Sequence, residues 1–85
     1  MPGPGVPSGI VSREDLVALA VLFDRYAYAF DPLSSGAREA KAQFEHRVVQ
    51  LFRERVEPNY QGVSLTDFRA KVRSLCRERL RKNPP

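Results

Sequence analysis

The chain has 85 residues, of which 42% are apolar, and a formal net charge of +4, which suits one small domain with a single modest core. One cysteine excludes an intramolecular disulfide, and one histidine leaves too few ligands for a zinc site, so we expect no metal and no cofactor. The chain has no signal-peptide pattern and no apolar run of the roughly eighteen residues that a membrane span needs, so we expect a cytoplasmic protein without membrane contact.

The first eleven residues, MPGPGVPSGIV, are dominated by proline, glycine and serine. Proline has no amide donor and glycine has no side chain to bury, so we predict that residues 1–11 form a flexible tail. Residues 12–83 should then form a single folded domain. Three stretches with helical periodicity and short connections predict an all-α fold, a compact three-helix bundle.

The first helix is predicted over residues 13–30. Ser12 is its N-cap, Asp15 stands at the capping-box position, and Val11 with Leu16 can form a hydrophobic staple across the cap. The helix must stop before Pro32, because a proline pushes the residue before it out of the α region. Its predicted core face consists of Leu16, Leu19, Ala20, Phe23, Tyr26, Ala27 and Phe30.

This helix also carries a second set of apolar residues, which we call the apolar strip: Val17, Val21 and Tyr28. With Leu16 at zero, the strip lies at about 100° to 140° on a helical wheel, outside the core face. A helix that is apolar on most sides is normally buried on most sides, but three helices cannot enclose one another completely. The strip is therefore covered by the tail, wedged between the other helices, or in contact with another protein or a second copy of the chain.

The second helix is predicted over residues 36–56. Two starts are open in the preceding connection: Asp31 as cap with Pro32 in the first turn, or Ser34 or Ser35 as cap. We prefer the later start, because Gly36 would weaken the interior of a longer helix. The apolar face of this helix consists of Ala37, Ala40, Phe44, Val48, Leu51 and Phe52. Its remaining sides carry charges of both signs, which is typical of a solvent face.

The third helix is predicted over residues 65–82, after a short loop that contains Pro58. Ser64 is its N-cap, Asp67 follows at the capping-box position, and Val63 with Phe68 repeats the hydrophobic staple. The three helices together predict a core of Leu16, Leu19, Phe23, Phe44, Val48, Leu51, Phe52, Phe68, Val72 and Leu75.

The third helix also carries an arginine row, formed by Arg69, Arg73, Arg77 and Arg81 at four-residue intervals. From residue 66 to the end there are seven basic and two acidic residues, so this segment holds the excess positive charge of the chain. A solvated face near a helix C-terminus is one interpretation of such a row. The other is a docking face, since guanidinium groups pair with carboxylates of an acidic protein surface or with nucleic-acid phosphates.

No catalytic pattern is present. His46 is predicted to lie on the surface with no nucleophile beside it, and Cys76 lies at the edge of the core arc, where a cysteine is usually an inert apolar residue. The alternative for Cys76 is a reactive thiol activated by neighbouring arginines. We therefore expect no enzyme and no small-molecule substrate. The favoured hypothesis is a protein-interaction module that uses the apolar strip and the arginine row, and the alternative is sequence-independent nucleic-acid binding through the arginine row.

Overall fold

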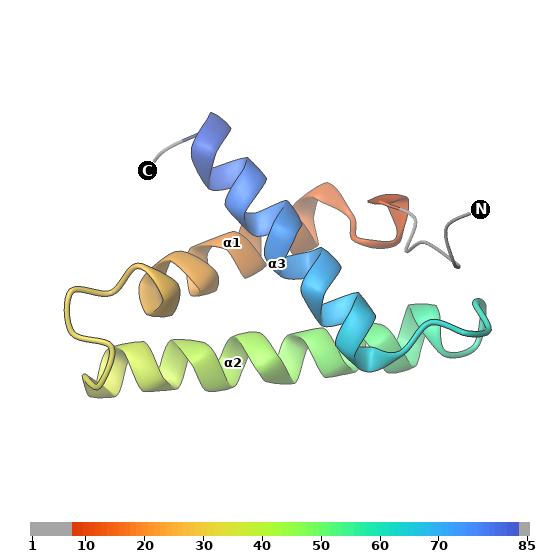
Figure 1. The fold of residues 1–85 in the computed structure, drawn as a ribbon, viewed down its shortest axis with the longest axis horizontal. Coiled ribbons are helices and arrows are strands. Elements are labelled where there is room, and N and C mark those ends of the chain that lie inside the picture. Colours follow the sequence, from red (N-terminus) through yellow and green to blue (C-terminus); the bar gives the residue numbers. More distant parts are fainter. Residues whose placement is uncertain (1–7, 84–85) are drawn as a thin grey trace.

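Three helices make up the fold that the computed structural model describes over residues 8–83 (Figure 1). They are α1 (Arg13–Ala27), α2 (Ser35–Leu51) and α3 (Leu65–Lys82). A 3₁₀ turn, η1 (Ser8–Ile10), precedes α1, and a π-helical turn, η2 (Phe52–Val56), continues α2. The predicted all-α class and three-helix bundle are confirmed, and residues 8–83 contain no strand. The first seven residues of the predicted tail lie outside the described range.

The helices α1 and α2 lie antiparallel, and α3 crosses α1 obliquely (Figure 1). The start of α3 lies beside the carboxyl-terminal half of α2, and from there α3 runs away from α2. The amino-terminal half of α2 is therefore left without cover from α3, whereas the end of α1 lies beside Arg77 and Leu80 of α3. This divergence positions the candidate binding surfaces described below.

The core lies between the three helices and is built on three fully buried phenylalanines, Phe23, Phe44 and Phe68. Seven predicted core residues are buried, whereas Leu16, Phe52 and Leu75 pack at its edge and are only partly buried. The core also includes Ala20, Ala37 and Ala40, which lie on the predicted apolar faces of their helices. The other buried residues outside the predicted core list are Ile10, Val11, Val56, Val63 and Cys76.

Each helix begins at a serine cap. The hydroxyl oxygens of Ser12, Ser34 and Ser64 accept the backbone N–H three residues later, at 3.1, 3.2 and 3.0 Å. These bonds satisfy amides that have no partner inside the first turn, which is why the chain enters a helix at each point. The helix α2 starts at Ser35, one residue before the predicted start, because Ser34 is the serine that caps it.

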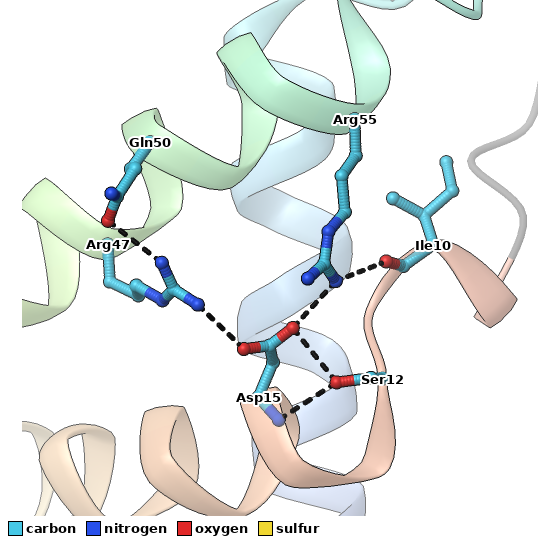
Figure 2. A network of polar contacts seen from close by, with 6 residues as sticks. All are labelled: Ile10, Ser12, Asp15, Arg47, Gln50 and Arg55. Atoms are coloured by element: carbon cyan, nitrogen blue, oxygen red, sulfur yellow. Dashed lines mark hydrogen bonds and ion pairs between the residues drawn. The ribbon is translucent and has the colours of Figure 1, made fainter.

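The predicted tail extends too far along the chain. Ile10 and Val11 are 8% and 7% exposed and belong to the core, so the predicted domain boundary at residue 12 is late. Figure 2 shows a polar contact to this segment: Arg55 donates to the Ile10 carbonyl at 3.3 Å and also to Asp15 Oδ2 at 2.6 Å. Composition alone misled the prediction, because two β-branched residues among the glycines and prolines are enough to cover one end of the core.

Asp15 is the centre of this polar network. Its carboxylate accepts bonds from Arg47 at 2.8 Å, from Arg55, and from the Ser12 hydroxyl at 2.9 Å (Figure 2). Burial by itself raises the pKa of Asp15, but the bonds from Arg47, Ser12 and Arg55 outweigh burial and hold the pKa below 3.8. In its charged form the carboxylate therefore joins α1 to Arg47 of α2 and Arg55 of η2, and Arg55 in turn bonds to Ile10 of η1.

The prediction for the end of the first helix is also wrong. The helix α1 ends at Ala27, and the Tyr28 amide closes the last turn onto the Asp24 carbonyl at 3.3 Å. The Tyr28 ring contacts the Phe23 ring edge-on, with centroids 5.9 Å apart, and the chain leaves the helix there. Phe30, expected in the core, is fully exposed. A proline sets the latest point at which a helix can end, and this helix ends earlier.

The π-helical turn changes which residues after α2 face the core. At an unbroken α-helical period, Arg55 would lie about 20° from Phe44, inside the core face, and Val56 about 120° away. The Glu57 amide instead bonds to the Phe52 carbonyl, five residues back, at 2.8 Å. The extra residue in this turn rotates the following side chains back by roughly 100°. Val56 is consequently buried, and Arg55 reaches Asp15.

Candidate interaction surface

The apolar strip on α1 is open to solvent. Val17, Val21 and Tyr28 are 39%, 47% and 59% exposed, whereas Leu19 and Phe23 of the same helix are buried. The strip is covered neither by α2 and α3 nor by the described residues that precede α1. Single exposed apolar residues are ordinary on a protein surface, but Val17 and Val21 share one face of α1, and Tyr28 follows directly after the helix, so the three form a patch that a partner can bury.

The strip is part of a longer line of exposed side chains, which we call the outer seam. Its members are Glu14, Val17, Ala18, Val21, Arg25 and Tyr28, and all are exposed. They recur at intervals of three and four residues, the spacing with which one helix packs lengthwise against another. The seam is apolar in the middle and charged toward its ends. Within residues 8–83, neither Glu14 nor Arg25 forms an ion pair.

The structure brings one end of the strip together with part of the arginine row. A hollow of about 460 Å³ is lined by Tyr28 and Asp24 on one side and by Arg77, Leu80 and Arg81 of α3 on the other. Tyr28 contributes an aromatic ring to this hollow, and the arginines contribute positive charge. Val17 and Val21 lie farther along α1 and do not line it.

The arginine row is less open than its spacing predicts. Arg69 donates to Glu45 of α2 at 2.7 Å, and Arg81 donates to Glu78 at 2.7 Å. Lys82 also pairs with Glu78, at 3.2 Å, and these bonds from Lys82 and Arg81 lower the pKa of Glu78. Two of the four arginines in the row are therefore partly neutralised by carboxylates of the same chain.

The middle of the row has no carboxylate partner within residues 8–83. Arg77 lies over the Phe23 ring, 5.8 Å from its centroid, in a cation–π contact. Arg73 is partly buried, and its Nε has no hydrogen-bond partner among the described residues. Arg73 and Arg77 also lie close enough to Tyr26 to lower its pKa, although burial, the larger effect, raises that pKa. The remaining positive face is thus centred on Arg73 and Arg77.

A second hollow, of about 550 Å³, was not predicted. It lies between the end of α1, the connection and the start of α2, and its lining includes Tyr26, Leu33, Arg38 and Lys41. Leu33 is 80% exposed at its mouth. No residue pattern predicted this hollow, because a connection rich in proline and serine is expected to be a polar loop.

The described residues offer no catalytic arrangement. Cys76 is buried, and burial raises the pKa of its thiol to about 12, so the reactive-thiol alternative is not supported. His46 is exposed, and no group of side chains within residues 8–83 could hold a metal ion. None of the three helices is long and apolar enough to cross a bilayer. This surface presents exposed apolar side chains beside arginine side chains.

Comparison with known proteins adds nothing to this picture. No protein-family model matches the chain, and no curated protein and no solved structure matches it either. The fold class by itself carries no function, because small helical bundles serve many unrelated roles. A function for this chain must therefore be argued from its exposed side chains.

Proposed function

We propose that this protein is a non-enzymatic interaction module that binds another protein, or itself, through the apolar strip of α1 and the neighbouring basic face of α3. The single observation that carries the proposal is the exposure of Val17, Val21 and Tyr28, at 39%, 47% and 59%, on a helix whose other side supplies the core. Burying these side chains against a partner removes apolar surface from water, which is the main favourable term in protein association.

The charges beside the strip indicate the chemistry of the partner. Arg77 and Arg81 share the hollow with Tyr28, and Arg77 has no ion pair within residues 8–83. A partner with apolar side chains at the centre of its contact surface and carboxylates at the rim would match both features. Such complementarity mainly increases the association rate and the specificity.

A nuclear magnetic resonance titration of the ¹⁵N-labelled chain tests this proposal. The probe is a synthetic helical peptide with leucines along one face and glutamates on the other, and the control is the same peptide with lysine in place of every glutamate. We expect the acidic peptide to shift the amide signals of Val21, Tyr28 and Arg77. Val21→Glu should abolish those shifts, and Arg77→Glu should weaken them. No shifts, or equal shifts with the lysine peptide, would contradict the proposal.

Nucleic-acid binding through the arginine row is the second candidate, and the pair of unneutralised arginines, Arg73 and Arg77, is what favours it. Binding would be independent of sequence, since phosphate contacts carry no base information. Pairing of Arg69 with Glu45 and of Arg81 with Glu78 weakens this candidate. Fluorescence anisotropy with a labelled DNA duplex decides it, because phosphate contacts are strong at about 50 mM salt, and absence of binding there dismisses it.

A cytoplasmic location and the absence of catalysis are part of the same proposal. The lone Cys76, with a buried thiol, is compatible with a reducing compartment. The two hollows described above are open depressions lined by a few side chains, and among residues 8–83 their linings contain no pair of groups arranged as nucleophile and base. We accordingly propose no small-molecule substrate and no membrane partner.

A further inference from the structure

We infer that the outer seam of α1 binds a second copy of this chain, with the two α1 helices packed side by side and antiparallel. This inference rests on the proposed function and specifies the partner for the strip. It names an isologous interface, in which the same surface of both copies takes part.

The apolar residues of the seam match in this arrangement. When two identical helices pack antiparallel about a twofold axis near residue 19, Val17 of each copy lies opposite Val21 of the other. Ala18, next to the axis, has only a methyl group and lets the two helices approach closely. The valines thereby form a continuous apolar centre from residues that are exposed in the single chain.

The charges of the seam select the antiparallel direction. The same axis brings Glu14 of one copy opposite Arg25 of the other, twice, once at each end of the apolar centre. A parallel pairing would place Glu14 against Glu14 and Arg25 against Arg25, which is repulsive. Both side chains are exposed, and neither has an ion pair within residues 8–83. Both are therefore available for a partner.

The interface is small. It involves one face of a helix of 15 residues, so it belongs with the weak and transient interfaces that bury less than about 1,200 Å² in total. We therefore expect a reversible dimer that forms at tens to hundreds of micromolar chain and dissociates on dilution. The monomer remains folded, because the core of each copy is complete without the seam.

Sedimentation equilibrium of charge-reversal variants tests the inference. Glu14→Arg and Arg25→Glu should each weaken the dimer about tenfold, because each change converts two attractive pairs into two repulsive ones. The double variant, Glu14→Arg with Arg25→Glu, restores the attraction and should return the affinity to near the wild-type value. Val21→Glu should abolish the dimer. Glu54→Arg, which alters the net charge as Glu14→Arg does but lies on η2, should leave the dimer unchanged.

Several outcomes would overturn the inference. They are a wild-type chain that stays monomeric up to millimolar concentration, single reversals that leave the affinity unchanged, and a double variant that fails to recover it. Circular dichroism on every variant separates lost association from lost folding. The peptide titration described above uses dilute, monomeric chain. A chain that does not dimerise therefore leaves the proposed function standing, and absence of peptide binding counts against the proposed function whether or not the chain dimerises.

Discussion

Replacing Asp15 with asparagine tests the role of the buried carboxylate in holding the amino-terminal segment on the bundle. Asparagine keeps the size of the side chain but removes its charge. The Asp15 side chain is 12% exposed and accepts guanidinium bonds at 2.8 and 2.6 Å, from Arg47 and Arg55. We expect Asp15→Asn to lower the free energy of unfolding and to loosen Ile10 and Val11 from the core.

The size of this loss follows from the environment of the three charges. A hydrogen bond to a charged group is worth about 1.5–3 kcal/mol. The side chains of Arg47 and Arg55 are 36% and 40% exposed, so water recovers much of their solvation when the carboxylate is lost. With that discount, we expect a loss of about 1–2 kcal/mol near pH 6, a large share of the roughly 4–12 kcal/mol typical of a domain of this size.

The loss depends on pH in a defined direction. The pKa of Asp15 is lowered in the folded chain, so its contribution is present in full above the unfolded value, near 3.8, and disappears as the pH falls through the lower folded value. The difference between wild type and Asp15→Asn should therefore shrink between pH 6 and pH 2. Urea unfolding, followed by circular dichroism, measures this difference in the free energy of unfolding without adding salt. Glu54→Gln, at an exposed position, serves as control. A variant as stable as the wild type at pH 6, or an equal difference at both pH values, would refute this reasoning.

Two further predictions concern the π-helical turn and the buried thiol. Deleting Glu54 should leave the fold intact, because the π-helical turn then becomes a regular α-helical turn and Val56 stays in the core. Deleting Gln43, which is also exposed, should unfold the chain by rotating the following core residues out of place. Circular dichroism and thermal unfolding of the two deletions make the comparison, and equal stability would contradict our account of the turn. Cys76, whose thiol has a pKa of about 12, should resist a thiol-reactive disulfide reagent at pH 8 until urea unfolds the chain. Complete modification within seconds in native buffer would show that the thiol is accessible.

The features that depend on short stretches of sequence were predictable. Ser12 and Ser64 cap their helices as predicted, because a cap is decided by residues three positions apart. The apolar strip itself was visible in the sequence, but its exposure was not, because the sequence left open whether the tail or the other helices cover it. The first core face was predicted up to Tyr26 but not at Phe30, where the helix has already ended.

Other features depend on contacts between distant residues and gave no local signal. The pairing of Arg69 with Glu45 joins residues on different helices, and it removes one cation from a row that looks open on a helical wheel. Arg55 bonds to the Ile10 carbonyl, and it reaches this carbonyl only because the π-helical turn rotates it out of the core. A wheel drawn at a constant period cannot show such a rotation.

The most direct test of the antiparallel seam is paramagnetic broadening between copies. The variant Arg13→Cys, whose cysteine lies just outside the seam, is prepared without ¹⁵N and carries a nitroxide on that cysteine. It is then mixed with ¹⁵N-labelled wild type. Because Cys76 is buried, the nitroxide should attach at position 13 alone. The account predicts the strongest broadening at residues 25–28 of the ¹⁵N-labelled copy. Strongest broadening near residue 13, or no broadening at hundreds of micromolar chain, would contradict it.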